Sequence, residues 1–98
     1  MKVKPSQNIL FYDGNPLKDQ NGGDVLVRDA VINAVNTMVQ DKEMSATDKS
    51  LAFQVSVKMY GKEEEVELDV KEMSFILDRG EKTLIPLVYG RLKELFDK

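Results

Sequence analysis

The chain has 98 residues, 42% of them hydrophobic and 32% charged, with a net charge of −3 and no His, Cys or Trp. This length and balance predict a single domain over residues 1–98 with one modest core, and the missing residue types exclude an imidazole base, a thiol nucleophile and soft metal ligands. We therefore expect a protein that binds rather than catalyses, with no catalytic residue, no metal site and no cofactor.

Residues 1–23 are predicted to form a β-hairpin followed by a loop. The run Asn8–Tyr12 is apolar and favours a strand, and the next four residues, Asp13–Pro16, are a strong turn signal. Leu17 is then expected on the returning strand. The first five residues, Met1–Pro5, are basic, but no apolar signal core follows them, so we do not expect secretion by that route.

Residues 24–98 are predicted to form a compact bundle of about four short helices, which makes the expected fold class α+β and mainly α. Asp24 is expected to cap the first helix. The apolar residues that follow recur on one helical face: Val27, Ala30, Val31, Ala34, Val35 and Met38. Residues 40–43 are polar and are interpreted as a connector.

The segment 51–60 allows two interpretations. Residues 45–48 (Ser-Ala-Thr-Asp) resemble a capping box that opens a helix, but the apolar residues after them also alternate at the period of a strand. We favour the helix. In that case Phe53, Val57 and Tyr60 form a second apolar edge, which must be covered by the domain itself or by a partner.

The stretch 63–81 is strongly acidic, with eight acidic residues against two basic ones. We expect the carboxylates of residues 63–72 to be exposed, with none of them in an apolar pocket where its pKa would be raised for general acid catalysis. Nucleic-acid binding needs clustered Lys and Arg, so direct contact with nucleic acid is not expected. Whether this stretch is an interface for a basic partner or a solvated face stays open.

The last third of the chain is predicted to contain a short strand and two helices. Residues 65–68 alternate as a strand does, and Asp69 with Glu72 suits the start of a third helix that ends near Gly80. Residues 84–96 form a final amphipathic stripe. Gly90 inside this last helix is explained either by the close approach of another backbone or by chance.

The order of these segments resembles a group of small, mostly uncharacterised accessory proteins of tailed bacteriophages and prophages. The resemblance runs over about 11–96 and rests on Asp-Gly-Asn-Pro-Leu (13–17), Val-Arg-Asp-Ala-Val-Ile-Asn-Ala-Val (27–35), Lys-Met-Tyr (58–60) and Pro-Leu-Val-Tyr-Gly-Arg (86–91). This chain departs from it at Val25 and Val27, where such proteins often have Thr before Leu-Arg-Asp. The resemblance implies a phage origin, a mainly helical fold and the cytoplasm of a bacterial host, but no activity.

Binding of a host or phage protein is the function that these observations favour. The leading hypothesis is a non-enzymatic inhibitor of a bacterial defence system, and the alternative is a head–tail or tail assembly factor that self-associates. A sponge for a small nucleotide signal ranks below both. No apolar run reaches the ~20 residues of a membrane span, so no membrane contact is expected. The candidate contact residues are Phe53, Val57, Tyr60, Glu64, Glu65, Glu67, Tyr89 and Arg91, with Phe11 and Tyr12 of the hairpin as further candidates.

Overall fold

The computed structural model describes residues 1–37, 44–61 and 64–97. Within these ranges the chain forms four helices and one pair of two-residue strands, which confirms the predicted α+β, mainly α, fold. In chain order the elements are β1 (Lys2–Val3), α1 (Val27–Asn36), α2 (Ala46–Tyr60), β2 (Val66–Glu67), α3 (Val70–Thr83) and α4 (Pro86–Phe96). The predicted positions of Met38 and of the connector 40–43 lie outside the described residues.

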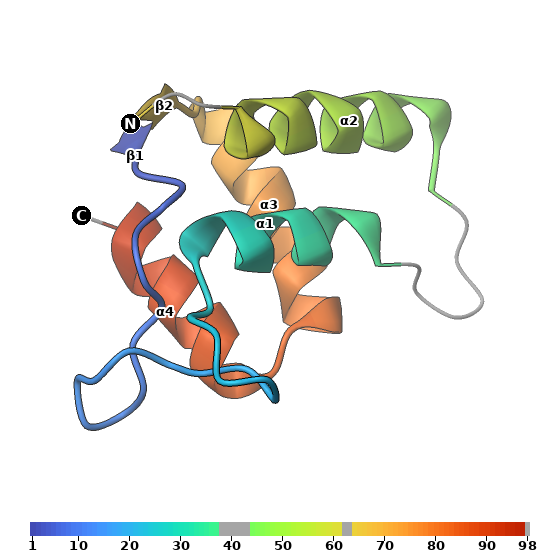
Figure 1. The fold of residues 1–98 in the computed structure, drawn as a ribbon. Helices are drawn as coiled ribbons and strands as arrows, with labels where there is room; N and C mark the ends of the chain where they lie inside the picture. Colours follow the sequence, from blue (N-terminus) through green and yellow to red (C-terminus); the bar gives the residue numbers. More distant parts are fainter. Residues whose placement is uncertain (38–43, 62–63, 98) are drawn as a thin grey trace.

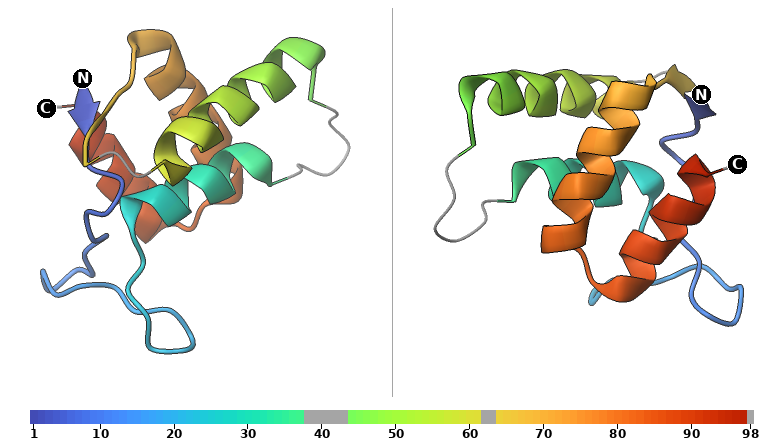
Figure 2. Two further views of the ribbon diagram at one scale, coloured as in Figure 1. Left: turned by 45° about the horizontal axis from the view of Figure 1, so that its top comes forward. Right: turned by 180° about the vertical axis from the view of Figure 1, so that it is seen from behind.

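The helices pack around one apolar core. Helices α1 and α2 lie side by side and run in opposite directions, and α3 crosses behind them (Figure 1). Seen from behind, α3 is in front, and α4 packs against it after a short turn (Figure 2). Every helix and the N-terminal segment contribute buried side chains to this core, among them Val3, Ile9, Val31, Val55, Met59, Leu68, Ile76, Leu92 and Phe96.

The predicted hairpin is present as two short segments that meet through isolated bridges. The N–H of Leu17 donates to the carbonyl of Ile9 at 2.8 Å, and the turn between them places Gly14 at a φ of 87°, a conformation that glycine adopts without strain. The chain then returns once more. The N–H of Val25 donates to the carbonyl of Leu17, and the N–H of Ile9 donates to the carbonyl of Val25. Backbone hydrogen bonds therefore hold together the three segments that contain Ile9, Leu17 and Val25.

The two strands join the start of the chain to the segment after α2. β1 and β2 are antiparallel, with Lys2 opposite Glu67 and Val3 opposite Val66. The predicted strand within 65–68 is confirmed, although its partner was not foreseen. Two-residue strands far apart in the sequence carry no local signal that would identify them as partners. This pairing links the N-terminal part of the domain to its helical part.

The helix starts were predicted correctly for α2 and α3 but not for α1. The Ser45 hydroxyl accepts a hydrogen bond from the N–H of Asp48 at 3.0 Å, and α2 follows, so 51–60 is helical as predicted. The prediction that Asp24 caps α1 is wrong, because the N-cap position of α1 is occupied by Leu26. Asp24 instead pairs with Lys18 across the preceding loop, and the carboxylate of Asp29 accepts the N–H of Leu26.

Gly80 and Gly90 have other roles in the helices than those expected from the sequence. Helix α3 does not end at Gly80 but continues to Thr83. A Cβ atom at Gly80 would lie 3.1 Å from Cδ1 of Leu84 and 3.6 Å from Cδ1 of Tyr89, so this glycine leaves room for the turn into α4. No other part of the described chain packs closely on Gly90, because a Cβ atom there would meet nothing within 4 Å. Of the two explanations for this glycine, the close approach of another backbone is therefore wrong.

Replacing Gly90 by alanine should therefore stabilise the protein by about 1 kcal/mol, the difference in helix propensity between the two residues. Gly80→Ala is the matched control in α3. Its gain in propensity should be reduced or reversed, because the Leu84 side chain must move. Urea unfolding of both variants measures the difference. Equal stabilisation by the two substitutions would contradict this account of Gly80.

Candidate binding surface on helix α2

Helix α2 has two apolar faces that differ in their burial. Its inner face contributes Ala52, Val55 and Met59 to the core, and Val55 and Met59 have no exposed surface. These residues are spaced three, four and seven positions apart, so they form one stripe along the helix. The Nε atom of Arg28 in α1 donates to the carbonyl of Met59 at 3.1 Å and fixes the end of α2 against α1.

The outer face of α2 carries the second apolar edge predicted from the sequence. Phe53 is 72% exposed, Val57 56% and Tyr60 76%, so the described part of the domain does not cover this edge. The three side chains span seven positions, or about 10 Å of helix. With Ser56 and Gly61 they line a shallow hollow of about 330 Å³. We call Phe53, Val57 and Tyr60 the outer stripe.

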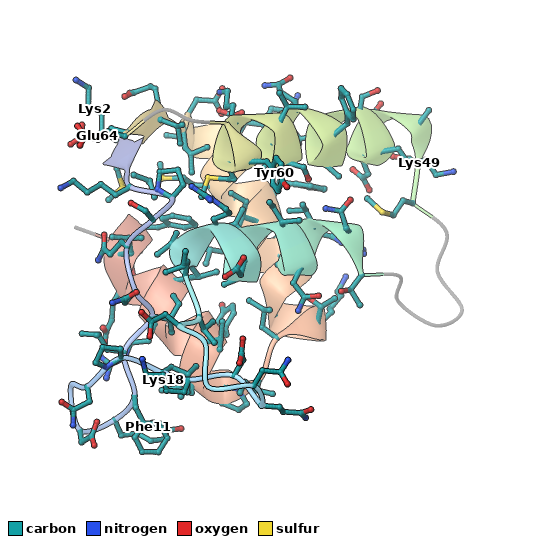
Figure 3. The ribbon with its side chains drawn as sticks, in the orientation of Figure 1. Lys2, Phe11, Lys18, Lys49, Tyr60 and Glu64 are labelled. Atoms are coloured by element: carbon teal, nitrogen blue, oxygen red, sulfur yellow. The ribbon has the colours of Figure 1, made fainter. Side chains whose placement is uncertain are left out.

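Opposite charges lie beyond the two ends of the outer stripe. Lys49 lies near the start of α2, whereas Glu64 lies in the segment after α2, beside β1 and Lys2, and both are exposed (Figure 3). Glu65 is also exposed. Sequence analysis did not single out Lys49, although its four-residue spacing from Phe53 places it on the same helical face.

Glu67 differs from its exposed acidic neighbours because its backbone is part of β2. Its carboxylate accepts a hydrogen bond from the amine of Met1 at 3.0 Å. Glu67 is therefore already engaged within the domain, whereas Glu64 and Glu65 form no salt bridge with any described residue. Glu63 lies outside the described residues.

Glu72 was expected to be exposed and is instead 1% exposed. Its Oε1 atom lies 2.8 Å from Nζ of Lys58 and 3.0 Å from the backbone nitrogen of Asp69, and its Oε2 atom lies 3.0 Å from Nε2 of Gln54. The prediction failed because Lys58 and Gln54 come from α2, and the packing of α2 beside the start of α3 cannot be read from local sequence.

Burial acts to raise the pKa of Glu72, but the hydrogen bonds from Lys58, from the backbone of Asp69 and from Gln54 outweigh it, so the pKa lies below its usual value. The carboxyl group is therefore charged near neutral pH, with partners for both of its oxygens. General acid catalysis by a carboxyl group requires the opposite shift. This cluster ties α2 to the start of α3.

The remaining predicted contact residues lie away from the outer stripe. The guanidinium of Arg91 donates to the carbonyls of Leu10 and Phe11 at 2.9 and 2.7 Å and contacts Glu94 at 3.2 Å, so it holds the hairpin turn against α4. Tyr89 is half-buried beside Gly80. The structure therefore places Phe53, Val57 and Tyr60 together on α2, Glu64 and Glu65 in the segment between α2 and β2, and Tyr89 and Arg91 on α4.

A larger groove of about 620 Å³ lies between the N-terminal loops, α1 and the turn from α3 to α4. Its walls are mainly apolar and include Leu84, Ile85 and Val88, and its charged lining residues are Lys18, Asp19 and Asp29. Sequence analysis missed this groove because its residues come from distant segments. The two carboxylates make it a poor site for a phosphate group.

The described residues hold no group of acidic side chains arranged to bind a metal ion. Among the helices in the described ranges, none has both the length and the apolar character needed to cross a membrane. Comparisons of the chain with protein-family models, with curated proteins and with solved structures find no match. Function is therefore inferred from the surface itself.

Proposed function

We propose that this chain is a non-enzymatic binding protein that contacts another protein through the outer stripe of α2. One observation supports this proposal above the others: three large apolar side chains on one helical face are 56–76% exposed. Water contact with such a cluster is unfavourable, and a contiguous apolar patch on a folded surface is typical of interaction sites.

The composition of the outer stripe supports a protein as the partner. Tyr60 and Phe53 are aromatic residues, which are enriched at the cores of protein interfaces, and a tyrosine hydroxyl can keep a hydrogen bond at the edge of the contact. Phe53, Tyr60 and the valine between them are held in position by a helix whose opposite face is fully buried. Binding therefore costs little ordering of the backbone.

The partner class is proposed from charge and from the phage resemblance. Glu64 and Glu65 are exposed in the segment that follows α2, so a protein that covers the outer stripe and reaches this segment would carry basic residues at one edge of its apolar patch. A basic, nucleic-acid-handling component of a bacterial defence system fits this description. In that case the chain acts as an inhibitor by covering the basic surface of its target.

Reversing the exposed charges of Glu64 and Glu65 should abolish capture of such a target. We expect Glu64→Lys/Glu65→Lys to lose the proteins that the wild-type chain retains from a bacterial lysate, because attraction to a basic surface becomes repulsion. Capture followed by mass spectrometry measures this loss. Glu67 is left unchanged, because its carboxylate and backbone hold the N-terminal strand.

The charge-matched control is Asp78→Lys/Glu81→Lys, which reverses two exposed acids on α3. Phe53→Asp should also lose capture, whereas Tyr12→Asp should keep it, because both residues are 72% exposed but only Phe53 belongs to the outer stripe. Capture of the same proteins by all four variants would refute the proposed surface.

Self-association is the second candidate function, and the outer stripe favours it as well, because an uncovered helix face can pack on a second copy of itself. A self-associating assembly factor would use the stripe in this way. The nucleotide sponge stays a prediction from the sequence. Calorimetry with cyclic nucleotides tests it, and absence of heat would remove it.

A further inference from the structure

We propose that the groove between the N-terminal loops, α1 and the turn from α3 to α4 binds a small organic cation, an amine joined to an apolar body. The groove shares no lining residue with the outer stripe, so this inference goes beyond the proposed function and does not depend on it. The shape of the groove, its apolar wall and its charge each support this class of ligand.

The groove has the size and composition of a small-molecule site. Its volume is about 620 Å³, within the range of about 300–1,000 Å³ that is typical of such sites. The loop 17–25, one side of α1 and the turn at 83–85 surround it (Figure 1). Most of the lining is apolar, and Gln20 and Asn33 add amide groups that can form hydrogen bonds. Ligand sites combine mainly apolar walls with a few polar groups in this way.

The apolar wall of the groove is formed before any ligand binds. Ile85 is 61% exposed, so the described part of the domain leaves most of this side chain in contact with water. The N–H of Leu84 donates to the carbonyl of Gly80 at 2.9 Å, and the N–H of Tyr89 donates to the carbonyl of Ile85 at 3.0 Å. These bonds fix the backbone on both sides of Ile85. An apolar ligand can therefore cover the wall with little ordering of the chain.

The charges of the groove favour a cation. Its charged lining residues are Lys18, Asp19 and Asp29. Lys18 forms a salt bridge with Asp24, whereas neither Asp19 nor Asp29 forms one with any described residue. Two carboxylates therefore remain without an opposite charge. They attract a cation to the groove and repel an anion.

Local hydrogen bonds hold both carboxylates in place through one oxygen each. Oδ1 of Asp19 accepts the N–H groups of Asn21 and Gly23 at 2.8 and 2.9 Å, and Oδ2 of Asp29 accepts the N–H of Leu26 at 3.1 Å. The second oxygen of each carboxylate forms no hydrogen bond with a described residue. Each can therefore accept a charge-assisted hydrogen bond from an ammonium group.

An inorganic cation fits this groove less well than an organic one. Calcium is typically held by about six to eight oxygen ligands, and no metal-binding group of acidic side chains is present in the described ranges. The helix dipoles do not decide the sign of the ligand, because the C-terminal end of α3 and the N-terminal end of α4 meet at this groove and offset each other. The apolar wall and the two carboxylates together favour an apolar amine.

Two-dimensional NMR of the full chain labelled with nitrogen-15, titrated with 4-phenylbutylamine at neutral pH, tests the proposal. The probe is an ammonium ion at this pH. The backbone signals of Ala30, Thr83 and Val88 should shift saturably, with a dissociation constant on the order of 1 mM, as expected for so small a probe. 4-Phenylbutyrate has the same apolar body and the opposite charge, and it should bind at least about tenfold more weakly.

Removing the two carboxylate charges gives the sharper test. Asp19→Asn/Asp29→Asn should weaken binding of the amine about tenfold and change binding of the neutral 4-phenylbutanol less than about twofold. Asparagine keeps an oxygen that can accept the N–H groups now bound by each aspartate. The charge-matched control is Asp78→Asn/Glu81→Gln, which removes two exposed acids of α3 that do not line the groove. It should leave binding of the amine within about twofold of the wild type.

Ile85→Ser tests the apolar wall separately. It should weaken binding of the amine and of the alcohol alike, each by about threefold or more, because both ligands lose the same apolar contact. Ile85 occupies the N-cap position of α4, where serine is a favoured residue, so the helix should be retained. Circular dichroism of each variant checks the fold.

The proposal is overturned if the amine shifts no signal of the groove up to about 20 mM, well above the expected dissociation constant. It is also overturned if 4-phenylbutyrate binds as tightly as the amine, or if the double asparagine variant binds the amine as the wild type does. None of these results would bear on capture of a protein through the outer stripe, because Phe53, Val57 and Tyr60 lie outside the groove.

Discussion

The Glu72→Gln variant should lose about 2–4 kcal/mol of unfolding free energy at neutral pH. In the wild type the buried carboxylate accepts hydrogen bonds from Lys58, the Asp69 backbone and Gln54. Glutamine has nearly the same shape, but it leaves the ammonium of Lys58 without an opposite charge. The substitution also replaces one carboxylate oxygen, which accepts hydrogen bonds, by an amide NH₂ group, which donates them. This NH₂ group would face the donors of Lys58, Gln54 or the Asp69 backbone.

Urea unfolding followed by circular dichroism measures this loss. Glu81→Gln is the matched control, because Glu81 is an exposed glutamate on the same helix. Its unfolding free energy should change by less than about 0.5 kcal/mol. Equal effects of the two substitutions would show that the Glu72 cluster does not stabilise the packing of α2 on α3.

The same carboxylate makes stability depend on pH in a defined direction. The pKa of Glu72 is lower in the folded protein than its ordinary value of 4.5. A group with a lowered folded pKa contributes stability above its unfolded pKa, and this contribution is lost as pH falls through the folded pKa. The difference in stability between wild type and Glu72→Gln should therefore be complete near neutral pH and shrink below about pH 4.5. A constant difference down to pH 3 would contradict this.

Local signals accounted for most of the helical fold. Ser45 and the pair Asp69 and Glu72 marked the starts of α2 and α3 correctly, because capping involves atoms only three residues apart. The same locality explains the confirmed turn at Gly14. Asp24 failed as a cap because a loop partner, Lys18, was available to it, and a capping residue cannot be told from a loop residue by its type.

Contacts between distant segments were not readable from the sequence. Arg91 was taken for an interface residue because its type is common at interfaces, yet its guanidinium reaches two carbonyls of the hairpin about eighty positions away. Glu72 appeared to be one of many exposed acids until α2 placed Lys58 beside it. In both cases a charged side chain is engaged by a neighbour that only the tertiary fold supplies.

The outer stripe, in contrast, was predicted as a second apolar edge from the spacing of Phe53, Val57 and Tyr60. Helical periodicity shows which residues share a face. Helix α2 has two apolar faces, one with Val55 and one with Val57. Periodicity does not say which set is buried by the domain. That choice depends on where α1 and α3 pack, and the structure assigns the Val55 face to the core.

A pair of matched substitutions on α2 should separate stability from binding. Val55 has no exposed surface and Val57 is 56% exposed, and the two residues lie two positions apart on opposite faces. Val55→Asp buries a carboxylate without a partner, which should cost about 4 kcal/mol or more. Because a domain of this size is stabilised by only about 5–15 kcal/mol, most of its stability should be lost.

Val57→Asp should change the unfolding free energy by less than about 1 kcal/mol, because its carboxylate stays in water and the helix propensities of Val and Asp are similar. It should instead weaken association through the outer stripe. Thermal unfolding separates the two variants, and sedimentation at high concentration reports the association. If Val57→Asp unfolds the domain as Val55→Asp does, the outer face is part of the core. If Val55→Asp leaves the melting curve unchanged, the assignment of the two faces of α2 is reversed.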